Sequence, residues 1–198
     1  MTNLIGLCGF ARSGKDSFAN FILEEQESCH TPKAEALSFA YALRKELESF
    51  VFSKLGISTF TEDPKEKEII RPLLVCWGTE VIRKRIDKNY WVKEVEKKAQ
   101  INRKNQITSI ITDVRFENEI NWIKEEKGLS VFVERENIGP KNADELHYTL
   151  PLKEKCDLTF TWPTLKNFNT EGKRLALHFL KENNLCHLTT ATKNLQTT

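Results

Sequence analysis

A glycine-rich stretch near the N-terminus has residue types and spacing that suit phosphate binding. Gly9 and Gly14 are separated by four residues, and Lys15 follows the second glycine directly. At this spacing backbone N–H groups curl around phosphate oxygens, while the lysine reaches the β- and γ-phosphates. The stretch follows the apolar run Leu4–Cys8 and precedes residues with helical periodicity, so a helix dipole would add to the site. The pattern predicts a nucleotide phosphate loop, with a simple turn as the alternative.

Asp16 stands where a Ser or Thr hydroxyl is expected to hold magnesium. A carboxylate this close to a triphosphate repels it unless a metal ion lies between them, so Asp16 is predicted to bind Mg²⁺ directly or through water. The alternative is a carboxylate that only favours the helix dipole, worth well under about 1 kcal/mol when exposed. Ser17 supplies a hydroxyl one position too late for the standard role. Arg12 either reaches the transferring phosphoryl group or is a solvated loop arginine.

A second candidate group follows a β-rich run in the middle of the chain. Residues 107–112 end at Asp113, the position from which a Walker-B-type carboxylate meets the magnesium shell. Arg115, two residues further on, has the planar fork that suits phosphate oxygens. A hydrophobic strand that ends in Asp is common in α/β folds, so this signal gains specificity only together with the loop. The predicted metal ligands are Asp16 and Asp113.

The elements that must position these groups alternate between strands and helices. We expect strands at residues 4–8, 34–38, 107–112, 129–134 and 158–162. We expect helical faces over residues 15–26, 40–51, 69–86, 90–95, 116–123 and 175–180. Pro72 predicts a helix break, Gly128 predicts a C-terminal helix cap, and 61–64 is a helix-start signal. The alternation predicts an α/β fold with a mainly parallel sheet, whose ligands gather at the carboxyl ends of the strands.

Composition limits the remaining possibilities. The 198 residues are 39% hydrophobic, which suits one substantial core, and we expect a single domain over residues 1–186. The 30 basic and 28 acidic residues give a net charge of +2, so neither nucleic acid nor a membrane is an expected partner. Five scattered cysteines and no long apolar segment indicate a reducing, cytoplasmic setting. Residues 187–198 are polar and aperiodic, and we expect a disordered tail there.

Several motifs together resemble the bacteriophage-type deoxynucleoside monophosphate kinase family, which shares the Asp after the loop lysine. The motifs are the loop ending in Asp16, the block 71–83 with Gly78-Thr79-Glu80, the run Tyr90-Trp91-Val92, and residues 112–115 with Glu119. The resemblance covers most of residues 4–136 and implies a three-layer P-loop NTPase fold. A helical acceptor-binding region at about 40–105 and a small lid at about 135–150 are also implied. The family's His-x-Ser-Glu element is met only by 142–145, with His147 displaced.

The resemblance implies transfer of the γ-phosphoryl group of ATP to a (deoxy)nucleoside 5′-monophosphate, with Mg²⁺. The implied catalytic residues are Arg12, Lys15, Asp16, Asp113 and Arg115. The predicted ATP-binding residues are Gly9, Ala11, Arg12, Ser13, Gly14, Lys15, Asp16, Ser17 and, from the lid, Arg135. The implied acceptor-binding residues are Arg44, Arg71, Gly78, Thr79, Glu80, Arg83 and Trp91. Arg83 has a solvated helix face as its alternative role, and Trp91 has core packing.

Three alternatives stay open at this point. The animal-type phosphomevalonate kinase family is also similar, because it shares the Gly-Lys-Asp loop, a Trp-Gly block and an Asp-x-Arg strand end. A protein of a different class, which binds ATP through the loop without transferring phosphate, would also retain Lys15. A homodimer is compatible with the sequence as much as a monomer is. In each case the ligands are small molecules.

Overall fold

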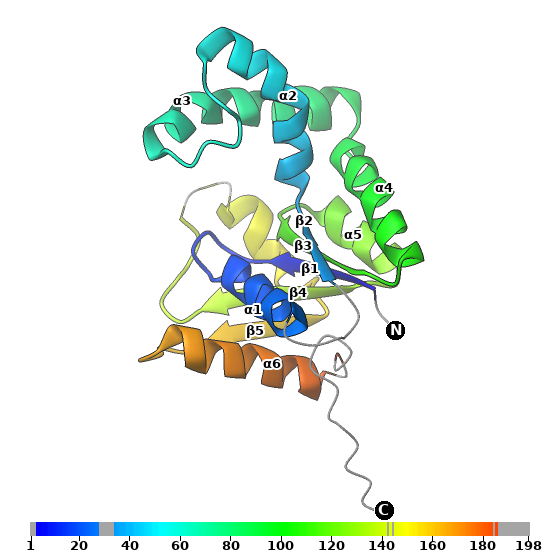
Figure 1. Cartoon of the computed structure of the whole chain (residues 1–198), viewed down its shortest axis with the longest axis vertical. Helices are drawn as coiled ribbons and strands as arrows, with labels where there is room; N and C mark the ends of the chain where they lie inside the picture. The colour runs from blue at the N-terminus through cyan, green and yellow to red at the C-terminus, as the bar shows by residue number, and fades with distance from the viewer. Residues whose placement is uncertain (1–2, 28–33, 142, 144, 184, 186–198) are drawn as a thin grey trace, which may run out of the picture. The chain divides into compact units, whose positions relative to one another are not determined.

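The chain contains two compact units. The computed structural model describes residues 3–27, 34–141, 143, 145–183 and 185 (Figure 1). The sheet unit comprises residues 1–36 and 99–198, and the helical unit comprises residues 37–98. The helical unit overlaps the region of about 40–105 to which the resemblance assigns acceptor binding. The predicted tail 187–198 lies outside the described residues, as do Asn142 and Asp144 of the predicted lid.

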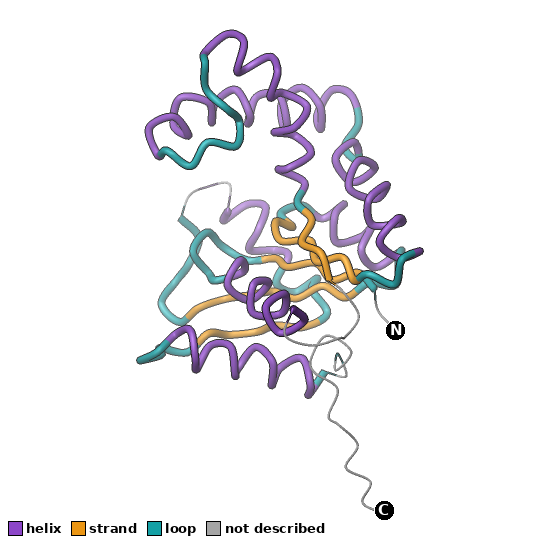
Figure 2. Tube along the Cα trace, in the orientation of Figure 1, coloured by secondary structure: helices purple, strands orange, loops and turns teal. Residues whose placement is uncertain are grey.

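Five strands form one sheet in the order β2-β3-β1-β4-β5 (Figure 2). The strands are β1 (Leu4–Cys8), β2 (Ala34–Leu37), β3 (Thr108–Val114), β4 (Leu129–Arg135) and β5 (Leu158–Trp162). The pairings of β1 with β3, of β1 with β4 and of β4 with β5 are all parallel. All five strands lie where the short β-rich runs predict them, and the α/β class with a mainly parallel sheet is confirmed.

Helices and shorter helical segments connect the strands. The α-helices are α1 (Lys15–Glu27), α2 (Phe39–Leu55), α3 (Pro64–Val75), α4 (Tyr90–Lys104), α5 (Glu117–Glu125) and α6 (Lys173–Glu182). The shorter or π-helical segments are η1 (Cys76–Ile86), η2 (Glu145–Thr149), η3 (Leu150–Leu152) and η4 (Phe168–Gly172). Among the helices of the described residues, none combines the length and hydropathy that crossing a membrane requires.

Both faces of the central strand β1 are covered, which explains its continuous burial. Ile5 and Leu7 point to one face and pack in the core that α1 and α6 close, and these two helices lie side by side (Figure 1). Gly6 points to the opposite face, where a Cβ atom would lie 2.2 Å from Cδ1 of Ile123 in α5. The sheet unit therefore has three layers, with helices on both faces of a sheet, as β-strands with alternating side-chain directions require.

An aromatic cluster fixes α1 against the sheet. The ring of Phe18 in α1 lies 4.9 Å from that of Phe160 in β5, and the ring of Phe21 lies 6.1 Å from that of Trp162. Phe160 and Trp162 meet edge to face at 4.6 Å. Such pairs contribute about 0.5–1.5 kcal/mol each beyond the area that they bury. Because α1 begins at Lys15, this cluster also holds the C-terminal end of the glycine-rich loop.

Two helices of the helical unit, α2 and α3, begin with side-chain caps. Ser38 accepts a hydrogen bond from the N–H of Tyr41 at the start of α2, at 3.1 Å. Asp63 accepts one from the N–H of Lys65 at 2.7 Å, so the helix start predicted at 61–64 is confirmed. Such caps typically stabilise a helix by about 1 kcal/mol. One core cluster of this unit contains the buried residues Leu47, Val51 and Ile70.

Two predicted helix boundaries are wrong. Helix α3 continues through Pro72 to Val75. Pro72 has no N–H to donate to the carbonyl of Glu68. Both residues are exposed, so water can hydrogen-bond to that carbonyl instead. Gly128 does not adopt the left-handed cap conformation after α5. Lys127 adopts it instead, with φ 55°, and the N–H of Gly128 donates to the carbonyl of Ile123 at 2.7 Å. The glycine is used for this close approach, since a Cβ there would lie 2.8 Å from that carbonyl oxygen.

Candidate active site

The glycine-rich loop between β1 and α1 is tightly bent. Gly9 has φ 142° and Gly14 has φ 89°, backbone conformations that residues with a side chain rarely adopt. A Cβ at Gly9 would lie 2.1 Å from the carbonyl oxygen of Val133, and one at Gly14 would lie 2.5 Å from Nε1 of Trp162. Arg12 is also left-handed, with φ 65°, a strained state for arginine that is common at functional sites. Both glycines are thus required by the loop's path.

Lys15 points back over this loop. Its Nζ donates to the carbonyl oxygens of Gly9 at 2.8 Å and of Phe10 at 2.7 Å. Burial, followed by the positive charge of Arg115, lowers the pKa of Lys15, while the carboxylate of Asp16 opposes the shift. A polyanionic ligand would stabilise this half-buried ammonium group, because added negative charge favours its protonated form.

The second predicted group meets the loop at the same edge of the sheet. Cys8, the last residue of β1, pairs with Val114 of the adjacent strand β3. The loop starts at Gly9, and half-buried Asp113 directly precedes Val114. Strand β3 runs one residue beyond Asp113, so this carboxylate belongs to the end of the strand itself. The prediction that Gly9 and Asp113 both fall at the carboxyl ends of their strands is confirmed.

Glu119 fixes the turn that follows β3. Its buried carboxylate accepts hydrogen bonds from the N–H groups of Arg115 at 2.7 Å and of Phe116 at 3.1 Å. These donors lie at the N-terminus of α5, where the helix dipole also stabilises a carboxylate. Glu119 therefore positions the backbone that carries Arg115, while the Arg115 residue itself is exposed.

The remaining loop residues differ in exposure. Asp16 is exposed in the first turn of α1, so its two alternatives, metal binding and a dipole contact, both remain available. Ser17 is half-buried, whereas Ser13 is fully buried and its Oγ has no hydrogen-bond partner in the described part of the chain. The described residues contain no cluster of three or more His, Cys, Asp or Glu side chains that could hold a metal ion. A site built on Asp16 and Asp113 would complete its shell with ligand and water oxygens.

Glu145, which the sequence did not predict as a site residue, contacts the loop directly. Its Oε1 accepts a hydrogen bond from the N–H of Ala11 at 2.7 Å, and its Oε2 accepts one from the N–H of Lys141 at 2.8 Å. Burial acts to raise the pKa of Glu145, but these bonds and the charges of Arg115 and Lys15 outweigh it and lower the pKa. The sequence signals for Glu145 are its place in the predicted lid and its match to the last residue of the family's His-x-Ser-Glu element.

Aromatic contacts fix the rest of the predicted lid. Tyr148 of η2 packs against Phe116 with ring centroids 5.4 Å apart, and His147 packs edge-on against Tyr148 at 4.7 Å. The guanidinium of Arg135 lies 4.7 Å from the ring centroid of Phe168 in η4, a cation–π contact. The role of Arg135 in ATP binding stays a prediction.

Two acceptor candidates have packing roles within the helical unit. Trp91 is only 2% exposed, and its indole N–H donates to the carbonyl oxygen of Gly78 at 3.0 Å. Gly78 is itself buried, and a Cβ there would lie 2.8 Å from Cδ2 of Leu43. Trp91 therefore has the core-packing role that the sequence left open, and it joins α4 to η1. Its place at the acceptor stays a prediction.

The other five acceptor candidates also belong to the helical unit. Arg71 is exposed on α3, and Glu80 is exposed and paired with Lys84, with Oε1 and Nζ 2.8 Å apart. Arg44, Thr79 and Arg83 are half-buried. Arg44, Arg71 and Arg83 thus stand on three different elements, α2, α3 and η1.

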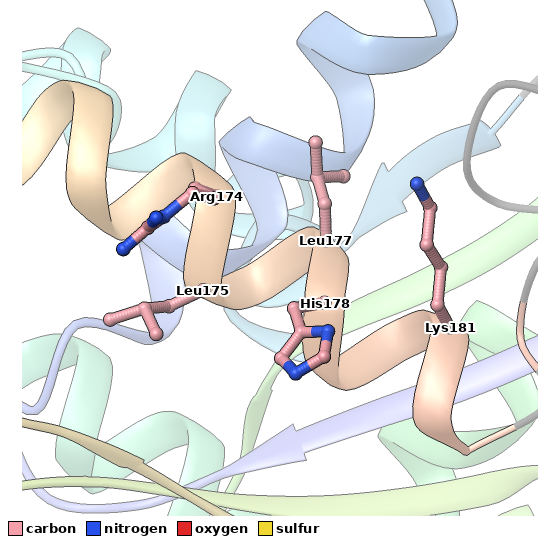
Figure 3. Close-up of a pocket in the computed structure, with 5 residues that line it drawn as sticks. All are labelled: Arg174, Leu175, Leu177, His178 and Lys181. Carbon is pink, nitrogen blue, oxygen red and sulfur yellow. The ribbon is translucent and has the colours of Figure 1, made fainter.

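One hollow of about 520 Å³ lies elsewhere on the sheet unit (Figure 3). Its described lining residues all come from α6 and are Arg174, Leu175, Leu177, His178 and Lys181. His178 is within ion-pair distance of Glu182, with Nε2 and Oε1 3.1 Å apart. None of these residues was predicted for the phosphate or acceptor site.

Comparison with solved structures identifies the fold. Dephospho-CoA kinase from Campylobacter jejuni matches with a TM-score of 0.53 and 13% identity, over 92% of this chain and 98% of that one. A sugar kinase from Janibacter matches with a TM-score of 0.48 and 13% identity, over 96% and 100%. APS kinase from Mycobacterium tuberculosis matches with a TM-score of 0.47 and 12% identity, over 91% and 97%. At these identities only the fold follows, and the predicted P-loop kinase fold is confirmed.

Comparison with protein families and curated sequences gives a narrower result. No curated protein matches the chain. The phosphomevalonate kinase family model matches residues 7–129, well over half of the sequence. This span includes the glycine-rich loop, the whole helical unit, Asp113 and Arg115. Of the two families that the motifs resemble, the match is to the second. The chain belongs to the phosphomevalonate kinase family.

Proposed function

We propose that this chain transfers the γ-phosphoryl group of ATP to the phosphate group of a small phosphomonoester, giving a diphosphate and ADP. Its family and its P-loop kinase fold support a small-molecule kinase in general. The observation that carries the proposal is one edge of the sheet, where the bent loop and Lys15 adjoin the strand end with Asp113 and Arg115. Two polyanions must meet in this reaction, and the site offers cations for them.

The loop is suited to ATP because it already holds an anion. The Glu145 carboxylate on the N–H of Ala11 occupies a donor of the kind that phosphate oxygens use. The backbone N–H groups of residues 9–16 and the ammonium of Lys15 would bind the phosphates. Asp16 and Asp113 would hold Mg²⁺, which supplies charge neutralisation between the β- and γ-phosphates when bound.

The chain's own groups would act by position and charge. The acceptor phosphate carries its own nucleophilic oxygen, so the reaction needs no protein nucleophile and little acid–base chemistry. The P–O bond from the γ-phosphorus to the leaving ADP oxygen breaks as the new bond to the acceptor oxygen forms. Arg115, whose backbone Glu119 fixes, and Arg12 would stabilise the charge that spreads over the transferring group.

A (deoxy)nucleoside 5′-monophosphate is the acceptor that the motif block in residues 71–83 favours. In this proposal Arg44, Arg71 and Arg83 bind its phosphate or line the surrounding pocket. Planar guanidinium groups match phosphate oxygens in pairs, which suits this task. The burial of Trp91 removes one aromatic side chain from the set available for base stacking.

Phosphomevalonate is the second candidate, and the family match favours it. This acceptor carries a carboxylate as well as a phosphate, so it needs one more cation than a phosphate alone. Three arginines in the helical unit suit such a ligand at least as well as a nucleotide. The two acceptors therefore differ in the part beyond the phosphate: phosphomevalonate has a carboxylate there, and a nucleotide has a sugar and a base.

An acceptor panel tests the proposal. The protein is incubated with Mg-ATP and, separately, with each common nucleoside and deoxynucleoside monophosphate and with phosphomevalonate, and ADP release is followed by a coupled assay. Acceptor-dependent ADP and a diphosphate product are expected with at least one compound. Turnover with phosphomevalonate alone would reject the nucleotide acceptor. ADP release that no acceptor stimulates, or ATP binding without turnover, would reject the kinase.

A further inference from the structure

The phosphate loop is tied to a carboxylate from a distant segment. Glu145 stands 134 residues from Ala11 in the sequence, yet its Oε1 accepts the Ala11 N–H at 2.7 Å. Its other oxygen, Oε2, accepts the N–H of Lys141 at 2.8 Å, so both carboxylate oxygens are held by backbone donors. Hydrogen bonds from N–H groups to a carboxylate are about twice as strong as those between neutral groups.

The charges around this contact are those that a phosphate would meet. Lys15 and Arg115 both act on Glu145 electrostatically, and Glu145 in turn favours the charged form of Lys15. The ammonium group of Lys15 donates hydrogen bonds to the loop carbonyls of Gly9 and Phe10. Glu145 therefore places a negative charge directly on a backbone donor of the loop, the Ala11 N–H.

A single backbone N–H cannot make a full hydrogen bond to two anions at once. A triphosphate that uses the Ala11 N–H must displace Glu145, and two like charges at the same donor also repel each other. The segment that would then move is η2, whose first residue is Glu145. Its Tyr148 packs on Phe116, the residue after Arg115.

We propose that Glu145 is an internal anion that occupies the phosphate loop in the nucleotide-free protein and that a bound phosphate chain displaces. The inference rests on the proposed function only in naming ATP as the natural ligand. Displacement would release η2 next to the turn that carries Arg115, so nucleotide binding and the surroundings of a catalytic candidate are coupled. The apparent affinity for phosphates then equals the intrinsic affinity multiplied by the fraction of loops that Glu145 leaves open.

Titration calorimetry on the full chain tests this with two probes, Mg-ATP and inorganic pyrophosphate. Glu145→Ala removes the internal anion and should lower the Kd of both probes by about three- to ten-fold. Glu145→Gln keeps the shape of the side chain and loses its charge, so its Kd values should lie between those of Glu145→Ala and wild type. Glu154→Gln, an exposed charge change in the same connection, should leave both Kd values unchanged.

The outcomes separate the two proposals. Equal or weaker binding of both probes to Glu145→Ala, with an unchanged melting temperature, would overturn the inference and make Glu145 a ligand contact or a mere loop tie. If Glu145→Ala has a lower melting temperature than wild type, the Kd values of Glu145→Gln are compared with those of wild type instead. If wild type binds pyrophosphate but not Mg-ATP, the proposed function fails while the pyrophosphate series still decides the role of Glu145.

Discussion

Replacing Gly9 by alanine should damage the phosphate loop more than any other change of one methyl group. The backbone of Gly9 has φ 142°, and an added Cβ would lie 2.1 Å from the carbonyl oxygen of Val133 in β4. The unfavourable backbone conformation costs roughly 1–3 kcal/mol. Because the obstacle is backbone within the sheet, relieving the overlap costs roughly another 1–3 kcal/mol. A total of about 4 kcal/mol lowers the melting temperature by roughly 8–16 °C in a chain of this length.

Scanning calorimetry on wild type, Gly9→Ala and the control Gly139→Ala measures this. Gly139 is exposed, and a Cβ there would meet nothing within 4 Å, so its variant should melt within about 2 °C of wild type. Binding of Mg-ATP to Gly9→Ala, measured below its melting temperature, should also be strongly weakened, because the loop N–H groups are redirected. If Gly9→Ala has the melting temperature of wild type and binds Mg-ATP with the wild-type Kd, the described loop geometry is refuted.

Three further predictions follow from single side chains. Asp16→Asn should raise the magnesium concentration needed for half-maximal turnover more than the ATP concentration, and an unchanged magnesium titration would assign Asp16 to the helix dipole. Trp91→Phe should cost about 1–3 kcal/mol in urea unfolding, because the carbonyl of Gly78 loses its buried donor, while the KM of the acceptor stays constant; a large rise in that KM would return Trp91 to the acceptor site. Folding lowers the pKa of Glu145, so its stabilising contribution is complete above the ordinary value of 4.5 and is lost as the pH falls through the lower folded value. The stability difference between wild type and Glu145→Gln should therefore shrink in acid, and a difference that grows there would contradict the pKa shift.

The strands and the phosphate loop could be predicted because their signals are local. Short β-rich runs define β1 and β3, and two glycines with a lysine at fixed spacing define the loop between β1 and α1. The meeting of Gly9 with Asp113 also followed, since parallel strands bring their carboxyl ends to one edge. Acceptor identity did not follow, because it depends on side chains spread over several helices.

Contacts between distant residues explain what the sequence did not predict. No local pattern encodes the bond between Glu145 and Ala11, because it joins the start of η2 to a loop 134 residues away in the sequence. Trp91 lies on an amphipathic helix, where periodicity marks a buried face and leaves open whether a ligand or the core covers it. Pro72 was predicted to break a helix from its chemistry alone, yet solvent at that position relieves the lost hydrogen bond.

The most direct test of the central claim is acceptor-dependent ADP release by wild type and by Lys15→Ala under identical Mg-ATP. The ammonium of Lys15 lies over the loop, and its removal deletes charge stabilisation of the transferring phosphoryl group. We predict a loss of at least about 100-fold in kcat, with the fold retained by circular dichroism. Turnover of Lys15→Ala within a few-fold of wild type would contradict a phosphate loop that works through Lys15.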